Sequence, residues 1–203
     1  PYLGETQESV IRFLKQVNPA FLDPDLPVEN RNYLDSIAQG NTSAKAAIDI
    51  ALHDICCKNK QVSLSHYYQL ENHPLPCSAY TISIDEDAVV KRKLDENQQF
   101  EIFKIKLGGE DDKSVIKTFR KYSRKKFYVD VNQGWKDRSY ALEMIVWLKE
   151  FGCLFVEQPL PKEKKEDIFC LKEKSPLPIF ADEGIQGMKD LEQVRGIIFL
   201  KNG

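Results

Sequence analysis

The stretch EIFKIKLGG at residues 101–109 decides the fold of this protein. It joins an apolar run to charged side chains, and the chain then repeats this arrangement three times. The repeats are FYVDVNQGW at 127–135, CLFVEQPL at 153–160 and PIFADEG at 178–184. A short, continuous apolar run of this kind is typical of a parallel strand that is buried on both faces.

The same alternation extends over the chain from residue 77 onward. Five apolar runs are expected to form strands, at 77–84, 100–107, 126–131, 153–156 and 177–181. Amphipathic segments with one apolar stripe are expected to form helices between these strands, at 85–98, 111–123, 136–150 and 163–174. Repeated strand–helix units predict a parallel sheet that is covered by helices.

The first third of the chain has a different pattern and predicts a small, largely helical domain over residues 1–76. Apolar residues recur at helical spacing over 42–58, which predicts the clearest helix of the chain. A shorter amphipathic helix is expected at about 6–17, and the Pro- and Asp-rich segment 18–30 is expected to be a loop. A turn signal, NHPLP, separates this domain from a second one at residues 77–203.

Charged side chains close successive strand-like runs at a nearly constant interval. Lys104 is followed by Asp130, Glu157 and Asp182 at steps of 26, 27 and 25 residues, each the length of one strand–helix unit. In a closed parallel barrel the C-terminal ends of successive strands converge at one mouth, where such enzymes carry their active sites. The spacing therefore predicts a common site at the strand ends.

Residues two apart on a strand point to the same side. Lys106 is therefore expected beside Lys104, and Asn132 beside Asp130. A single charge at a strand end is usually no more than a solvated side chain. The register over three consecutive units favours a gathered site of three carboxylates and two lysines instead.

Three ionised carboxylates this close repel one another unless a cation lies between them. Oxygen donors without Cys or His suit Mg²⁺ better than Zn²⁺. A neighbouring cation lowers the pKa of a lysine toward neutrality, which suits it to accept a proton. The constellation predicts proton abstraction beside a substrate carboxylate, with metal charge stabilising the enediolate that forms.

In these residues the chain resembles the enolase superfamily and, within it, the muconate-lactonizing-enzyme subgroup. The matching text is KIKLGG at 104–109, VDVNQGW at 129–135, VEQPL at 156–160 and ADEG at 181–184. SAKAAIDIALHDI at 43–55 resembles a cap-domain helix of that group, and YTISI at 80–84 resembles its first barrel strand. The motif series is most similar to that of dipeptide epimerases of the L-Ala-D/L-Glu type. The resemblance implies a (β/α) TIM-like barrel, incomplete in this chain, with an N-terminal α+β cap domain of which mainly helices are present.

The resemblance also implies a role for each site residue. The Mg²⁺ ligands would be Asp130, Glu157 and Asp182, and Asn132 would support the metal shell. Lys106 would be the acid/base on one face of the substrate, and Lys104 would tune it and hydrogen-bond near the substrate carboxylate. A second acid/base lysine is expected on a sixth strand, because inversion needs a proton donor on each face.

The expected activity is Mg²⁺-dependent epimerisation of a small dipeptide by 1,1-proton transfer, which is an isomerase reaction. Muconate cycloisomerase and o-succinylbenzoate synthase chemistry use the same enediolate and stay open as alternatives. A non-catalytic remnant that binds a metal or a carboxylate is the alternative from a different class. A histidine base is disfavoured, because no His follows a predicted strand.

Two further residues are expected near the substrate. Thr81 on the first strand would line the substrate channel. Trp135 follows Gly134 at the rim of the site and would either shape the pocket or only pack.

At 203 residues the chain is short for a TIM barrel, whose usual size is about 250 residues. The helical domain leaves room for about five strand–helix units, where a barrel has eight. No N-x-K-L text follows Asp182, although the closing RGIIFLKNG offers Lys201. We therefore expect that a barrel segment is missing from the sequence between about 190 and 199.

The amino-acid composition narrows the classes of molecule that this protein is expected to bind. With 29 Lys+Arg against 31 Asp+Glu and a net charge of −2, the chain lacks the basic excess of a nucleic-acid-binding protein. No apolar stretch approaches the length of about 18–20 residues that spans a bilayer. Five cysteines without a C-x-x-C pair favour a reducing compartment, so a cytoplasmic protein with a small-molecule substrate is expected. A homo-oligomer is an expectation from the resemblance alone.

Overall fold

The computed structural model describes residues 4–71, 73, 76–187 and 190. The chain divides into two compact units, Pro1–Leu75 and Pro76–Gly203. The proposed missing segment at about 190–199 and Lys201 lie outside the described residues, apart from residue 190 itself. Among the described residues, no helix has both the length and the apolar character required to cross a membrane. All five cysteines are free thiols.

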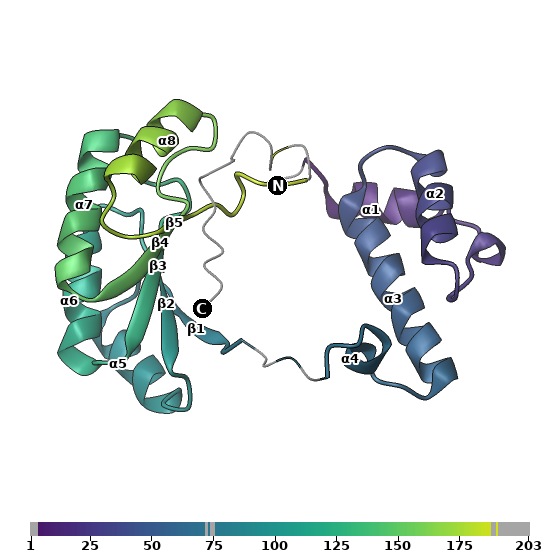
Figure 1. Ribbon diagram of the computed structural model, residues 1–203, viewed down its shortest axis with the longest axis horizontal. Helices are drawn as coiled ribbons and strands as arrows, with labels where there is room; N and C mark the ends of the chain where they lie inside the picture. Colours follow the sequence, from purple (N-terminus) through teal and green to yellow (C-terminus); the bar gives the residue numbers. More distant parts are fainter. Residues whose placement is uncertain (1–3, 72, 74–75, 188–189, 191–203) are drawn as a thin grey trace. The chain divides into compact units, whose positions relative to one another are not determined.

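The N-terminal unit consists of helices (Figure 1). They are α1 (Gln7–Leu14), the 3₁₀ helix η1 (Pro19–Phe21), α2 (Pro27–Ile37), α3 (Thr42–Lys60) and α4 (Leu64–Tyr67). Phe13, Leu34 and Ala44, from α1, α2 and α3, form its buried cluster. The helix predicted at 42–58 is confirmed as α3, and the shorter helix predicted at about 6–17 is confirmed as α1.

The loop predicted over 18–30 is wrong in part, because α2 begins inside it. Pro27 occupies the first helical position of α2. Proline is well suited to that position, since its fixed φ matches the helix and its missing N–H would have no intrahelical partner there. The prolines that suggested a loop therefore include one that starts a helix.

Helix α3 receives its N-terminal cap from a residue distant in sequence. Asn41 precedes the helix in a left-handed conformation and its side chain makes no capping hydrogen bond. The carboxylate of Glu5 accepts hydrogen bonds from the Thr42 hydroxyl at 3.0 Å and from the Ser43 N–H at 2.9 Å instead. Hydrogen bonds from Ser43 and Thr42 lower the pKa of Glu5 to about 2.

Glu5→Gln is expected to lower the melting temperature of the N-terminal unit by a few degrees at pH 7, because a neutral amide caps a helix N-terminus less well than a carboxylate. A lowered folded-state pKa stabilises above the unfolded value of 4.5 and loses that effect as pH falls toward 2. The difference between variant and wild type should therefore shrink over this window in thermal unfolding followed by circular dichroism. Asp54→Asn is the control, because Asp54 is an exposed carboxylate within α3, away from the N-terminus of that helix. An unchanged difference at pH 2 would show that the carboxylate charge does not act here.

The second unit is a five-stranded parallel sheet with the sequential order β1-β2-β3-β4-β5. The strands are β1 (Ala79–Ile82), β2 (Ile102–Lys106), β3 (Lys126–Asp130), β4 (Cys153–Glu157) and β5 (Ile179–Phe180). The helices are α5 (Asp87–Glu96), α6 (Asp112–Tyr122), α7 (Arg138–Glu150) and α8 (Lys165–Lys174). All five predicted strands and all four predicted helices of this unit are confirmed, with shifts of a few residues at their ends.

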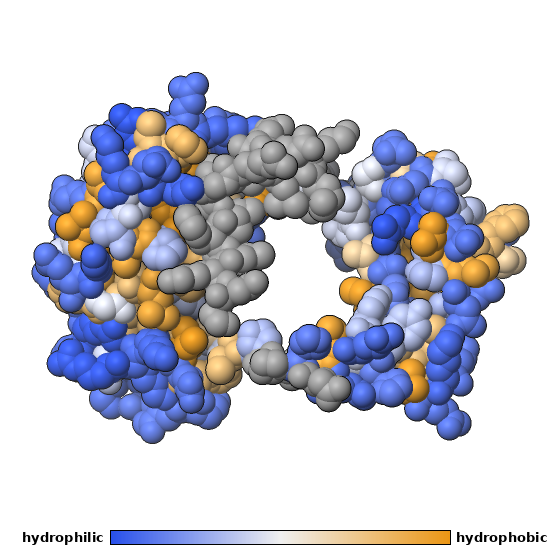
Figure 2. All heavy atoms as spheres, in the orientation of Figure 1, coloured by the Kyte–Doolittle hydropathy of each residue, from blue (hydrophilic) through white to orange (hydrophobic). Residues whose placement is uncertain are grey.

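The four helices all cover one face of the sheet (Figure 1). A sequential strand order with helices on a single face is the pattern of a (β/α) barrel, whereas a doubly wound sheet carries helices on both faces. The outer surfaces of these helices are mostly hydrophilic (Figure 2), as one buried stripe per helix requires. The predicted fold class is therefore confirmed, with five strands of a barrel in the described residues.

Successive side chains along each strand point to opposite faces of the sheet. Phe103, Ile105 and Val129 point toward the helices and are buried in the main core. Lys104 and Tyr128 point to the opposite face, which is the interior of a barrel. This alternation delivers the charged residues at the strand ends to the barrel interior.

Candidate active site

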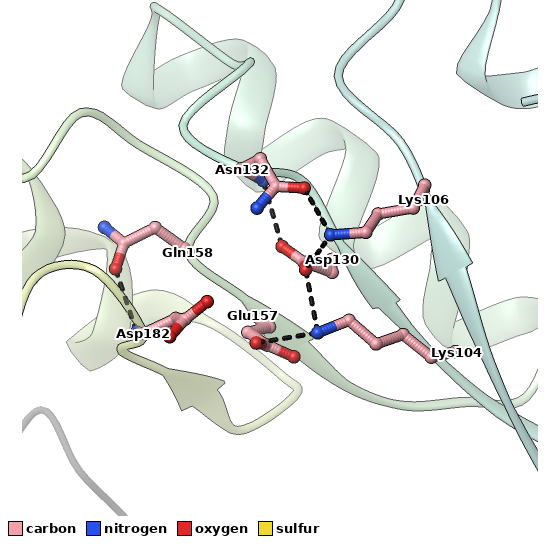
Figure 3. A network of polar contacts seen from close by, with 7 residues as sticks. All are labelled: Lys104, Lys106, Asp130, Asn132, Glu157, Gln158 and Asp182. Carbon is pink, nitrogen blue, oxygen red and sulfur yellow. Dashed lines mark hydrogen bonds and ion pairs between the residues drawn. The ribbon is translucent and has the colours of Figure 1, made fainter. Parts of the chain in front are cut away.

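The sheet register places the predicted site residues in one layer. Lys106 pairs with Asp130, and Asp130 pairs with Glu157. Glu157 in turn pairs with Phe180, and Asp182 follows Phe180 by two residues. Figure 3 shows the side chains converging from these strand ends.

Three carboxylates form a compact cluster at this edge of the sheet. Asp130, Glu157 and Asp182 each offer an oxygen within 4.8 Å of the others. Asp130 is fully buried, Glu157 is half-buried and Asp182 is exposed. The gathering that the spacing predicted is therefore present in the structure.

Two lysines face the carboxylates. The Lys104 Nζ lies 2.8 Å from Asp130 Oδ2 and donates to Glu157 Oε1 at 2.9 Å. The Lys106 Nζ donates to Asp130 Oδ2 and to Asn132 Oδ1, both at 2.7 Å (Figure 3). Both ammonium groups thus lie against the cluster, and both share one oxygen of Asp130.

These contacts shift the pKa values of the cluster in different directions. Burial alone would raise the pKa of Asp130, but hydrogen bonds from Lys104 and Lys106 outweigh it and hold that pKa below its usual range. Burial raises the pKa of Glu157, and the charges of Asp130 and Asp182 add to the rise beyond what Lys104 can offset. The pKa of Lys104 lies above its ordinary value, because hydrogen bonds to Asp130 and Glu157 outweigh its burial.

The donor set fits a hard divalent cation. Three carboxylates against two ammonium groups leave the cluster with an excess negative charge. Burial is the main cause of the raised pKa of Glu157, and the neighbouring charges of Asp130 and Asp182 add to it. Carboxylate oxygens are the ligands that Mg²⁺ takes in proteins, so these residues could hold it.

The main chain beside the cluster adopts an uncommon conformation. Asn132, Gln133 and Gln158 have φ values of 47°, 66° and 41°, in the left-handed region. This conformation is strained for residues other than glycine. It persists where the surrounding structure fixes the main chain, often at functional sites. The turn after β3 also needs Gly134, because a Cβ there would lie 2.4 Å from the Gly108 Cα.

Thr81 and Trp135 have different positions relative to the cluster. Thr81 is exposed on β1 and pairs in register with Lys104, so it lies on the barrel face beside that lysine. Trp135 is 2% exposed, and its Nε1 donates to Asp112 Oδ2 at 2.7 Å. Of the two roles considered for Trp135, the geometry supports packing, because its indole has almost no surface to offer a substrate.

Sequence reasoning gave no role to two buried polar residues near the site. Asp112 accepts hydrogen bonds from the N–H groups of Gly108 and Gly109 as well as from Trp135, and so ties the turn after β2 to the turn after β3. Gln158 bonds to the segment that carries Asp182. Gln158 stands inside the VEQPL motif, but nothing in a local pattern indicates a partner 24 residues away.

Two family models match the chain. Residues 5–67 match the mandelate racemase / muconate lactonizing enzyme N-terminal domain, and residues 87–195 match the enolase C-terminal domain-like family. Among curated proteins, an L-Ala-D/L-Glu epimerase of Bacteroides thetaiotaomicron is 46% identical over 198 residues, which cover 97% of this chain and 52% of that protein. The chain spans about half the length of the curated relatives it matches.

Two solved structures extend the comparison. A dipeptide epimerase from Enterococcus faecalis V583 superposes with a TM-score of 0.84 at 27% identity, over 95% of this chain and 57% of that one. A dipeptide epimerase from Cytophaga hutchinsonii, complexed with Mg and the dipeptide D-Ala-L-Val, gives 0.81 at 25% identity, over 97% of this chain and 55% of that one. From the matched domains, the strand order and the carboxylate cluster together, the chain belongs to the enolase superfamily.

Proposed function

We propose that this protein is a Mg²⁺-dependent epimerase of a small dipeptide of the L-Ala-D/L-Glu type. The observation that carries the proposal is the position of Lys106, whose Nζ lies 2.7 Å from Asp130 in the carboxylate cluster. A substrate carboxylate bound at that cluster would present its α-carbon to this lysine. The relatives named as epimerases support this choice of reaction over the cycloisomerase alternative.

Each residue of the cluster has a proposed part in the reaction. Asp130, Glu157 and Asp182 would hold Mg²⁺, whose charge, when it is bound, stabilises an enediolate. Lys106 would release a proton to solvent and then, as the neutral amine, take the α-proton. Asn132 would orient Lys106 through the hydrogen bond at 2.7 Å. Lys104 remains protonated against the carboxylates and would donate a hydrogen bond near the substrate carboxylate.

Inversion requires a proton donor on the opposite face of the α-carbon. The resemblance implies a donor on a sixth strand, and the described residues contain five strands. We propose a lysine there. Thr81, beside Lys104 on β1, would line the substrate channel.

We further propose residues 1–76 as the cap domain and 77–203 as the barrel domain. The division into two compact units and the two family matches support that boundary. A cytoplasmic location is supported by the five free thiols. A homo-oligomer is proposed from the family alone.

Solvent exchange tests the proposed reaction. The full chain is incubated with L-Ala-L-Glu or L-Ala-D-Glu in D₂O, with Mg²⁺ or with a chelator, and the α-proton is followed by NMR. Exchange with inversion, which stops when Mg²⁺ is removed, is the expected result. Exchange without inversion would show that Lys106 acts without a partner, and no exchange would favour the non-catalytic remnant. In a parallel incubation with muconate, consumption of muconate by a chain that does not exchange the dipeptide α-proton would favour a cycloisomerase.

A further inference from the structure

Gln158 lies directly after Glu157 at the end of β4, and its side chain is buried, with 2% exposed. Its Oε1 accepts hydrogen bonds from the backbone N–H of Asp182 at 3.0 Å and of Gly184 at 3.1 Å. Its Nε2 donates to the backbone oxygen of Leu160 at 3.0 Å. The carboxamide thus joins the end of β4 to the segment after β5 that carries Asp182 (Figure 3).

The main chain of Gln158 holds two further strand ends. Its N–H donates to the Phe180 oxygen at 2.9 Å, and its carbonyl accepts from the Gln133 N–H at 2.8 Å. Its φ of 41° is strained for a residue with a side chain. A conformation of this kind persists where surrounding contacts determine it, and here those contacts come from the ends of β3, β4 and β5.

The fit around the carboxamide is close. A Cβ at Gly184 would lie 3.1 Å from Gln158 Oε1, which is tighter than an ordinary contact, so a larger residue there would push the carboxamide by a few tenths of an ångström. The segment at Gly184 therefore leaves little free space beside the Gln158 carboxamide.

Asp182 is positioned differently from the other two carboxylates of the cluster. Lys104 contacts the side chains of Asp130 and Glu157. Gln158 instead contacts the main chain of Asp182, by accepting a hydrogen bond from its backbone N–H. The Asp182 side chain is exposed, and the position of its backbone sets the region that its carboxylate oxygens can reach.

We propose that Gln158 is a positioning residue that sets the affinity of the carboxylate cluster for a divalent cation. It does so by fixing the backbone of Asp182, so that three carboxylates meet instead of two. The inference rests on the metal site of the proposed function, and it assigns Gln158 no contact with substrate.

The test compares Gln158→Met with the full wild-type chain. Methionine keeps the length of the side chain and removes both polar atoms. Mn²⁺ affinity is measured by electron paramagnetic resonance, and amide exchange at Asp182 and Gly184 by NMR. The dissociation constant for Mn²⁺ is expected to rise about 10- to 100-fold, the usual effect of losing a partner that orients metal ligands. The two amides are expected to exchange faster.

A matched control separates positioning from general loss of stability. Met144 is a fully buried residue of α7 with no hydrogen bond to the cluster, so Met144→Ala destabilises the same unit without touching the site. Its Mn²⁺ affinity is expected to stay within about twofold of wild type. If wild type binds Mn²⁺ and Gln158→Met binds it with the same affinity, the inference about Gln158 is overturned while the proposed metal site stands. Equal weakening in both variants would also overturn the inference. No Mn²⁺ binding by wild type would overturn the proposed metal site and the inference with it.

Discussion

Lys106→Met is expected to slow exchange of the substrate α-proton by about 10²–10⁴-fold, because this is the usual contribution of a positioned general base. Methionine retains the length and apolar stem of the side chain but has no amine. Loss of positive charge beside Asp130 should leave divalent-cation affinity unchanged or slightly stronger. NMR of the α-proton in D₂O measures the first effect, and Mn²⁺ binding measures the second.

Lys113→Met is the control for this variant. Lys113 is partly exposed on α6, where it pairs with Glu143 at 3.0 Å, away from the carboxylate cluster. Its exchange rate is expected to equal that of wild type. A Lys106→Met variant that retains more than a tenth of the wild-type rate would contradict the role of Lys106 as the base.

Asp130→Asn is expected to weaken Mg²⁺ binding by more than about 100-fold, since loss of a direct ligand exceeds the 10- to 100-fold effect of losing a residue that only supports one. The substitution changes little volume and keeps one oxygen, but it removes the charge from a side chain that is 0% exposed and faces Lys104 and Lys106. Exchange of the substrate α-proton is expected to fall below detection, because an enediolate without metal charge is too unstable to form.

Stability measurements accompany the metal titration. The Asp130→Asn variant leaves Lys104 and Lys106 without their shared carboxylate, so the free energy of unfolding is expected to fall by about 1–3 kcal/mol in urea titrations. Asp95→Asn, an exposed carboxylate of α5 that pairs with Lys91, should change neither metal affinity nor stability measurably. Retention of wild-type Mg²⁺ affinity by Asp130→Asn would exclude this carboxylate as a ligand.

The two further variants test contacts between segments distant in sequence. Glu5→Gln tests how α3 is capped across 38 residues of chain, and Gln158→Met tests how Asp182 is fixed across 24. Glu5 and Gln158 are polar residues, and no local sequence pattern indicates which distant segment either of them bonds to. Each hydrogen bond forms only when folding brings the two segments together at the right distance and angle.

Much of the barrel unit could be predicted from the sequence. Each strand is a continuous apolar run and each helix has one apolar stripe, and these periods arise from local backbone geometry. The regular return of Lys104, Asp130, Glu157 and Asp182 followed from the length of one strand–helix unit. In the N-terminal unit, α2 was missed because Pro27 suggests a loop locally but starts a helix when Leu34 packs against Phe13 and Ala44.

The sequence by itself determined the strands, the order of the units and the residue types that gather at their ends, because these depend on periodicity over short distances. Only the tertiary structure decided which atoms meet. Lys104 and Lys106 share Asp130, Trp135 turns inward to Asp112, and Gln158 holds Asp182. Hydrogen bonds and ion pairs depend on distances of a few tenths of an ångström between segments far apart in the chain, and a one-dimensional pattern carries no such distances.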